Sequence, residues 1–600
     1  MYYKIKVDIP AVKGKISRFS KDGQTYIRYM AERTYRPEKK FNSANYRTIG
    51  KVCENDSSKM YPNETYTQYF DADFLKEEVP FSSARSCCLK TGSFLVMKKL
   101  IEELKLEEYL LQAFSAKDAA LVLDLALYCI ITENNAGQYF PDYEYDHPLF
   151  AENMHICSDS KISDFFLDMS ENERRMFLGV WNQSKDHEQK IYISYDSTNK
   201  NCQAGDMDLA EFGHPKDDRG LPVINMSMAY DTENWDPLFY EEYPGSINDV
   251  SQLKYMLEKA AGYGYQNVGF ILDRGYFSES NIRYMDEKGI SYIMMFKGKK
   301  ELVRSLILSE KGTFEDKWDH YIERFDAYGA DIDSYLLSSD IDKGKKRHFH
   351  LYYSDDKAAA EKKELKERIS RMEEALKKVQ GKSFEASREY LDLFDLFYWE
   401  DKENKKKILQ SARVKTKVVQ EELSLCGYYV IITSEEMTAE HSLTKYKNRD
   451  VSEKLFRDDK TFIGGRSLRV QSTNSAASKL FIEFIALIIR NRIYTKLSDE
   501  TQRLKKRLNY MNVAAALKEL EKIMIVRDMK GQWRLSYAVT KTQKTILKAF
   551  GMDEHKINTE ARELGRYIEK CDKENVEKHK KTATPEGASD DGSDGLGDLD

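Results

Sequence analysis

The chain contains 600 residues, which is too long for one hydrophobic core, so several domains are expected. Hydrophobic residues make up 41% of the chain and aromatic residues 12%, which excludes a disordered protein. The eight cysteines form no CxxC pair, which argues against a disulfide framework or a zinc site and indicates free thiols in a reducing compartment.

The charge balance permits a nucleic-acid partner. Residues 584–600 carry six acidic side chains and no basic one, so without them the net charge of −6 becomes zero. The neutral remainder contains four basic clusters, at 297–300, 343–347, 405–407 and 503–507. Such clusters are usually solvated surface, but together they permit contacts with phosphates.

No segment predicts a membrane protein. The first ten residues, MYYKIKVDIP, lack the apolar stretch of a secretory signal. The two most apolar runs, 119–131 and 480–489, are shorter than a bilayer span and each contains an acid, Asp124 or Glu483. Both runs therefore predict buried core helices.

The first 188 residues divide into two patterns. Residues 1–75 alternate apolar and polar side chains, which predicts a strand-rich module that contacts DNA or a second copy. Residues 76–188 change to a helical pattern, a candidate DNA-binding domain without a helix-turn-helix signature.

From residue 189 the pattern is α/β. IYISYDST predicts a strand ending on Asp196, two further strands and a helix follow, and NVGFILDRGY predicts a fourth strand ending on Asp273. A helix and a fifth strand, ISYIMMFKG, complete a sheet of mixed direction. In a mixed sheet the first and fourth strands can be neighbours, which would bring the two carboxylates together.

Residues 301–424 interrupt this sheet, which resumes with GYYVIITS. The interruption begins with a strand series and continues with a highly charged helix. An apolar seam runs along this helix at spacings of 4, 3, 4 and 3 residues and consists of Leu365, Ile369, Met372, Leu376 and Val379. This spacing predicts a helical hairpin or short coiled-coil arm.

The stretch YKNRDVSEKLFRDDK, residues 446–460, predicts a helix with a polar stripe. At about 100° per residue, Arg449, Glu453 and Lys460 fall within about 60° of Tyr446. A carboxylate flanked by cations and a phenol suits a metal ion surrounded by phosphates. The alternative is a solvated helix face with ordinary charge spacing.

Two strand-end acids favour the metal site. Three converging carboxylates repel one another unless divalent ions lie between them. Two Mg²⁺ ions held by Asp196, Asp273 and Glu453 would suit phosphodiester chemistry, with one ion activating the attacking oxygen and the other stabilising the leaving oxygen.

The spacing Tyr446-x2-Arg449-x3-Glu453-x6-Lys460 resembles the YREK signature of bacterial insertion-sequence transposases of the DDE class, the IS-four superfamily. YDST and LDRGY resemble the family's contexts for its first and second Asp, and EKLFRDDK resembles its E-x-x-F-R-x-x-K. GHPKDDRG resembles a family loop that usually has Ser where Pro215 stands, and SKLFIEFIALIIRNRI resembles the apolar helix that closes such domains. The resemblance covers about 190–300 and 425–495.

The resemblance implies an RNase H-like core that binds two Mg²⁺ or Mn²⁺ ions through Asp196, Asp273 and Glu453. It implies cleavage at transposon ends and strand transfer into target DNA, with hairpin ends in cut-and-paste members. The resemblance also implies a synaptic homodimer and a clamp on DNA phosphates. It implies a bacterial cytoplasmic location, on the nucleoid when the protein is bound to DNA. The clamp would consist of Tyr446, Arg449 and Lys460, and Trp318 is the candidate that receives a flipped base.

The expected fold class is α/β, with an RNase H-like mixed sheet interrupted by an insertion and flanked by β-rich and helical regions. The C-terminal region is a candidate dimerisation region, followed by a disordered acidic tail. The expected domains are 1–75, 76–188, 189–300, 301–424, 425–498, 499–572 and 573–600.

Two alternative functions remain at this stage. One is a transposase-derived DNA-binding protein that no longer cuts, and the other is a different RNase H-like metal nuclease, such as a resolvase or an RNA hydrolase. The intact acidic triad disfavours the first alternative, and the Tyr-Arg-Lys stripe disfavours the second. The terminal repeat, the target site and the segment that reads the ends are left open.

Overall fold

The computed structural model describes the whole chain apart from a set of short gaps and the C-terminal end. The residues outside it are 1, 4, 22, 37–40, 71–84, 203–206, 213–220, 248, 297–299, 343, 402–405, 507, 529–530 and 583–600. The family-like loop GHPKDDRG and most of the acidic tail lie outside the described residues. The chain forms two compact units: 1–95 with 141–156 and 518–600, and 96–140 with 157–517.

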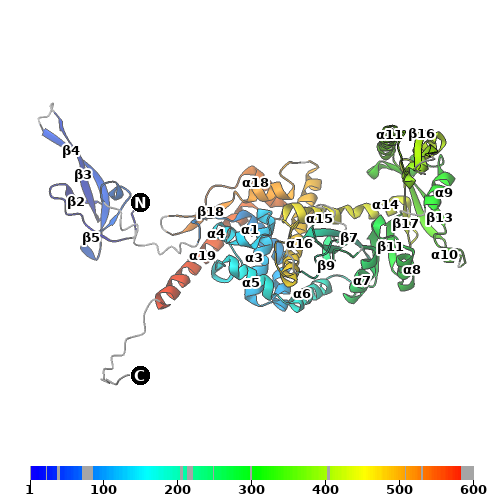
Figure 1. The fold of residues 1–600 in the computed structure, drawn as a ribbon. Helices are drawn as coiled ribbons and strands as arrows, with labels where there is room; N and C mark the ends of the chain where they lie inside the picture. The colour runs from blue at the N-terminus through cyan, green and yellow to red at the C-terminus, as the bar shows by residue number, and fades with distance from the viewer. Residues whose placement is uncertain are drawn as a thin grey trace, which may run out of the picture. The chain divides into compact units, whose positions relative to one another are not determined.

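The N-terminal residues form the expected strands (Figure 1). Five antiparallel strands pair in the order β1-β5-β4-β3-β2. Their apolar face buries Ile27, Ile49 and Met60 together with Tyr66. The bounds are β1 Val7–Asp8, β2 Ile16–Lys21, β3 Gln24–Arg36, β4 Phe41–Cys53 and β5 Asp56–Pro62.

The rest of this unit contains a three-stranded sheet, in the order β19-β18-β6, and the C-terminal helices. The last helix continues to Thr582, so residues 573–582, expected in the disordered tail, are helical. Glu574–Lys578 and Glu577–Lys581 have the i,i+4 spacing that stabilises a helix. The bounds are β6 Cys88–Lys90, β18 Met524–Arg527, β19 Trp533–Leu535, α18 Lys541–Ala549 and α19 Glu554–Thr582. The chain passes from the second unit to the first within α17 (Val513–Leu520).

Six helices precede the central sheet. They are α1 Gly92–Glu103, α2 Leu106–Ala113, α3 Ala116–Thr132, α4 Phe140–Asp146, α5 Asp159–Asp168 and α6 Glu171–Gln183. Helix α3 is buried along most of its length and packs against the apolar helix α16 (Thr473–Leu504), as expected for two core helices. Among the described residues no single helix is long and apolar enough to cross a membrane, although one bent pair, Ala116–Thr132 with Gly137–Asp146, passes that test.

The central sheet confirms the expected RNase H-like core. Its strand order is β12-β13-β14-β17-β11-β10-β7-β8-β9. Strands β7, β8 and β9 form an antiparallel meander, and β10 and β11 are added in parallel beside β7. The bounds are β7 Ile191–Asn201, β8 Val223–Asp231, β9 Asp236–Pro244, β10 Val268–Leu272, β11 Ser291–Met295 and β17 Tyr428–Thr433, with helices α7 Asp249–Gly262 and α8 Glu279–Lys288.

The interrupting segment has two parts. Strands β12 (Tyr321–Ile322), β13 (Ala327–Ser334) and β14 (Arg347–Tyr353) extend the central sheet beyond β17. The long helix α11 (Asp355–Val379) carries the predicted apolar seam, but the seam packs on the two-stranded sheet of β15 (Phe394–Asp401) and β16 (Lys406–Val414).

The expected helical hairpin is therefore wrong. Met372 and Leu376 of the seam pack against Phe394 and Leu409, which are strand residues. A 4, 3 spacing specifies an apolar stripe but not whether a helix or a sheet covers it. The remaining helices of the segment are α9 Lys300–Glu310, α10 Ser338–Asp342, α12 Arg388–Leu393 and α13 Thr416–Ser424.

Candidate active site

The two aspartates lie on neighbouring parallel strands. The prediction that the first strand ends on Asp196 is wrong, because β7 continues to Asn201 through its pairing with β8. Strand β7 carries Asp196, and Asp273 follows β10 directly. The parallel register pairs Leu272 with Tyr195, so one step further Asp273 stands beside Asp196. Adjacent strands lie about 4.8 Å apart. This spacing brings the two half-buried carboxylates to one edge of the sheet.

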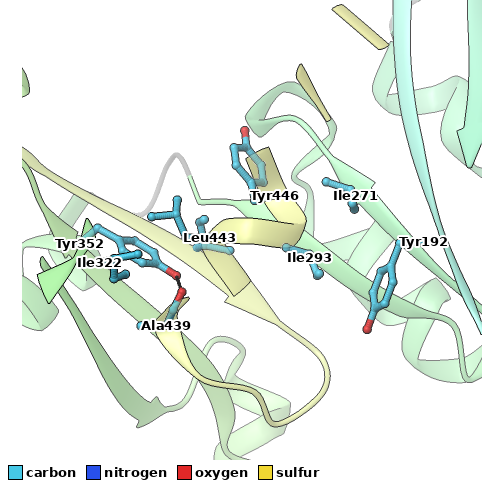
Figure 2. Packing of buried hydrophobic residues seen from close by; sticks show 9 residues of the cluster. Tyr192, Ile271, Ile293, Ile322, Tyr352, Ala439, Leu443 and Tyr446 are labelled. Atoms are coloured by element: carbon cyan, nitrogen blue, oxygen red, sulfur yellow. Dashed lines mark hydrogen bonds between the residues drawn. The ribbon is translucent and has the colours of Figure 1, made fainter. Parts of the chain in front are cut away.

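A buried apolar cluster fixes the sheet face on which both acids lie (Figure 2). Tyr192 and Ile271 belong to this cluster, and side chains two or four residues apart on a strand share a face. Asp196 therefore lies on the face of Tyr192, and Asp273 lies on the face of Ile271. The helix α14 (Ala439–Asn448) covers this face through Leu443 and Tyr446 of the same cluster.

The last turn of helix α14 and the residue that follows the helix present two side chains to Asp273. The Tyr446 hydroxyl donates to Asp273 Oδ1 over 3.5 Å, and Arg449 Nη1 lies 3.3 Å from the same oxygen. The guanidinium of Arg449 also lies over the Tyr446 ring, 5.1 Å from its centroid. A buried cation and a phenol therefore converge on one carboxylate.

The stripe does not lie on one uninterrupted helix, as the sequence suggested. Helix α14 ends at Asn448, Arg449 follows, and α15 (Asp450–Phe462) begins after it. Arg449 keeps helical dihedral angles, but its N–H bonds to the Tyr446 carbonyl, three residues back. Such tight turns are typical of helix ends. Periodicity alone cannot locate this break, because the residue on either side of it remains helical.

A fully buried ion cluster attaches α15 to β7. Lys200 Nζ donates to Asp459 Oδ2 over 2.5 Å and to Glu483 Oε2 over 2.6 Å, and all three side chains are 0% exposed. Asn135 Nδ2 donates to the second oxygen of Glu483 over 2.8 Å. Lys479 is also buried, four residues before Glu483 on α16, so two cations balance two carboxylates. Lys200, Asp459, Glu483 and Lys479 are called the Lys200 cluster below.

The opposite charges within the Lys200 cluster stabilise one another. Burial lowers the pKa of Lys200, but the Asp459 and Glu483 carboxylates outweigh it and raise the pKa above its ordinary value. Burial raises the pKa of Asp459 to about 6 although the Lys200 ammonium opposes this. Burial also lowers the pKa of Lys479 to about 8. Near neutral pH Lys200, Asp459 and Lys479 are therefore ionised without access to water.

The loop after α15 packs closely against this cluster. Gly464 has a φ of +80°, which favours glycine. A Cβ added to Gly465 would lie 2.5 Å from Asp459 Oδ1 and 2.6 Å from Lys200 Nζ. Because the side chains of Asp459 and Lys200 are fully buried and joined through Asp459 Oδ2, neither has room to move away. The two glycines therefore let the chain close over Lys200.

Two anchors bracket Glu453. Arg449 ties the start of α15 to Asp273, and Asp459 ties its later part to Lys200. The helix rises about 15 Å over these ten residues, and β7 rises about 13 Å from Asp196 to Lys200. The matching lengths lay α15 along β7, with the backbone of Glu453 between the two anchors. The structure describes the backbone of Glu453 but not its side chain.

The other predicted residues lie apart from the aspartates or at the far end of α15. Lys460 is half-buried next to Asp459. Trp318 lies in the interrupting segment, is 80% exposed and packs its ring 5.3 Å from that of Tyr321. Among the side chains that the structure describes, no group of three metal-ligand residues gathers, and the third expected ligand, Glu453, is outside that set.

The donor chemistry at the sheet edge fits a divalent cation. Asp196 and Asp273 supply carboxylate oxygens, the ligands that Mg²⁺ prefers. The Ser197 N–H donates to Asp196 Oδ1 over 2.8 Å, which orients that carboxylate. Arg449 meanwhile supplies positive charge to Asp273.

Sequence reasoning missed the Lys200 cluster. Lys200 stands in an exposed-looking stretch, STNKN, where a lysine usually indicates a solvated strand end. The available signal was Glu483, an acid in the middle of the apolar run 480–489, because a buried carboxylate requires a partner. The partner itself, 283 residues earlier, could not be identified from the sequence.

The segment that contains both aspartates matches a known protein family. Residues 193–489 match the family model described as the transposase DDE domain. Among solved structures the chain is similar to a piggyBac transposase in a synaptic complex with hairpin DNA, at 9% identity and a TM-score of 0.31, covering 83% of this chain and 87% of that one. A search of curated proteins found no match.

Replacing Lys200 with Met tests the buried anchor. Removing one partner of a buried ion pair costs about 3–5 kcal/mol, because the carboxylates lose their cation. The same change at Lys190, a half-exposed partner of Glu435, should cost less than about 1 kcal/mol. Thermal unfolding of the two variants would compare them.

The stability lost in Lys200→Met should depend on pH in a defined direction. Without Lys200 the folded-state pKa of Asp459 rises further above its unfolded value, so the folded chain binds more protons than the unfolded chain. Stability of Lys200→Met then falls as pH rises, and its deficit is larger at about pH 8 than at about pH 5. Equal deficits for Lys200→Met and Lys190→Met would contradict the assignment.

Proposed function

We propose that the chain is a DNA transposase that cleaves DNA at transposon ends and joins the released ends to target DNA, as the match of residues 193–489 to the transposase DDE domain supports. The observation that carries the proposal is the pairing of β10 beside β7, which sets Asp273 next to Asp196, with α15 anchored across the same face. Hairpin ends in a cut-and-paste reaction belong to the proposal through the resemblance of the YREK signature.

Asp196, Asp273 and Glu453 would hold two Mg²⁺ or Mn²⁺ ions. When bound, such ions activate an attacking water or 3′-hydroxyl and stabilise the leaving oxygen of a phosphodiester. The chain's own contribution is to fix the carboxylates. The sheet register sets the two aspartates side by side, and the two anchors of α15 would position Glu453 for the same ions.

Tyr446, Arg449 and Lys460 would bind the phosphates of the transferred strand end. Arg449 contacts Asp273 in this structure, and its guanidinium has further donors for a phosphate oxygen. Its burial strengthens both interactions, because the local dielectric is low. Arg449 would therefore couple the position of the acid to the position of the DNA.

The partners follow from the reaction. Transposon-end DNA and target DNA are the substrates, and a synaptic homodimer would bring two ends together. A bacterial cytoplasmic location, on the nucleoid when DNA-bound, completes the proposal. The competing function, a DNA-binding protein that no longer cuts, predicts binding of end DNA with no nicking in the presence of Mg²⁺.

Replacing each proposed ligand tests the reaction. Asp196→Ala, Asp273→Ala and Glu453→Ala should each reduce Mg²⁺-dependent cleavage to background while DNA binding persists, because a ligand and not a binding surface is lost. Asp450→Ala, an exposed acid at the start of α15, is the matched control and should keep cleavage. Full cleavage by any of the three ligand variants would remove that residue from the site.

Replacing Arg449 tests the clamp. Loss of a buried charge-assisted bond costs about 1.5–3 kcal/mol, so Arg449→Ala should weaken end-complex assembly or hairpin formation about tenfold or more. Arg457→Ala, on the exposed side of α15, should leave both steps intact. Gel-shift and product assays would measure them, and unchanged transposition by Arg449→Ala would exclude a clamp role.

Replacing Trp318 tests base flipping. An indole that is 80% exposed is free to stack on an extruded base. Trp318→Ala should slow hairpin formation, whereas Trp399→Ala, a second exposed tryptophan, should not. Hairpin formation at the normal rate by Trp318→Ala would dismiss this role.

A further inference from the structure

The N-terminal strands carry a charge opposite to that of the rest of the chain. Residues 1–70 contain fourteen basic and seven acidic side chains, a net charge of +7. Because the whole chain carries −6, the remaining residues carry −13. A concentration of positive charge in one small sheet of an acidic protein is the electrostatic footprint of a polyanion partner.

Part of this sheet consists of two strands only. Strands β3 and β4 have 13 residues each and pair from Tyr26–Lys51 to Arg36–Phe41. Strand β2 pairs with β3 only as far as Tyr29, and β5 pairs with β4 only from Gly50 onwards. Residues 30–36 and 41–47 therefore form a two-stranded ribbon that extends beyond the other strands (Figure 1).

This ribbon lies outside the apolar core of its own sheet. Among the described side chains, the buried cluster of the sheet takes its β3 and β4 residues from Ile27, Tyr29, Ile49 and Val52, and none comes from the described part of the ribbon. A two-stranded ribbon without a third strand is marginally stable in water. Its paired strands, about 20 Å long, therefore gain stability from a partner that covers them.

The positive charge of the ribbon indicates that its partner is negatively charged. Residues 28–47 contain six basic and two acidic side chains, a net charge of +4. Among the described side chains of the ribbon, Arg33 and Arg47 are exposed, as are Thr34 and Asn45. Arginine with small polar side chains is the combination that contacts phosphates and base edges.

The base of the ribbon is held in place. Arg28 Nε donates to Ser17 Oγ over 2.9 Å, and the guanidinium lies 5.5 Å from the Phe19 ring centroid and 4.5 Å from that of Tyr46. Tyr46 is itself 39% exposed. The contacts fix the direction in which the ribbon leaves the sheet, so little ordering is required on binding.

We propose that the β3–β4 ribbon, residues 30–36 and 41–47, binds duplex DNA by lying in its major groove, with Arg33 and Arg47 contacting the phosphates. A major groove about 12 Å wide admits a two-stranded β-ribbon. The inference rests on the proposed function, which makes DNA the substrate, and it assigns the DNA contact to a surface distant in sequence from the acidic residues. An acidic protein partner is the competing occupant.

The test uses the full-length chain and a fluorescent duplex of about three helical turns. The variant is Arg33→Ala/Arg47→Ala. The matched control is Lys556→Ala/Arg562→Ala, two exposed basic residues on α19, which lowers the net charge equally. Fluorescence anisotropy at several salt concentrations gives affinity and its salt dependence, and circular dichroism checks that each protein is folded.

The ribbon variant should lose about tenfold or more in affinity, and the slope of log affinity against log salt should fall by about 2, or about one phosphate contact for each arginine. The control should keep the wild-type values. Equal loss in both variants, no loss in either, or no duplex binding by the wild type would overturn the proposal.

The two proposals fail separately. Binding by Glu453→Ala that still depends on Arg33 and Arg47 supports the ribbon whether or not the wild type cleaves DNA. Suppose instead that cleavage requires Glu453 but that the ribbon variant binds DNA as tightly as the wild type. The proposed reaction then stands, and the proposed DNA contact of the ribbon is overturned.

Discussion

The arrangement of the candidate site depends on one buried ion cluster, in which a lysine of β7 lies between an acid of α15 and an acid of α16. None of the three side chains is exposed to water, so each charge is stabilised by the others and by the Asn135 amide. An ion pair of this kind adds little net stability over an apolar replacement, but its separation is costly. Helix α15 can therefore not shift along β7 without leaving a charge unpaired.

The second constraint is the register of the sheet. Parallel pairing of β10 beside β7 sets Asp273 next to Asp196, and the apolar cluster beneath α14 turns both toward the same side. Arg449 joins the two constraints, because it stands between α14 and α15 and contacts Asp273. Two ends of one helix are thus attached to two points on the sheet, and Glu453 lies between them in the chain.

Local patterns predicted much of this architecture. The strands that carry Asp196 and precede Asp273 were visible because each apolar run stops at an acid, although β7 itself continues to Asn201. The order of strands and helices predicted a sheet of mixed direction, which the structure confirms. Tyr446 and Arg449 were found from their spacing to Glu453, and the structure places both against Asp273. The site assignment itself remains a prediction until its ligands are tested.

What the sequence did not predict depends on contacts between distant segments. The seam of α11 was visible, but its strand partners were not, because an apolar stripe does not specify its cover. The turn at Arg449 keeps helical angles and leaves no periodic signal. Lys200 and Glu483 are 283 residues apart, and neither alone indicates a buried pair. The helix that continues to Thr582 was missed because the low hydrophobic content of residues 573–600 predicted disorder, although residues 574–581 have the i,i+4 charge spacing of a helix.

The most direct test of the account is a manganese anomalous difference map from crystals of the chain grown with DNA and Mn²⁺. The account predicts two peaks about 4 Å apart, bridged by the carboxylates of Asp196, Asp273 and Glu453. Peaks elsewhere in the chain, or a Glu453 side chain turned away from both aspartates, would contradict it.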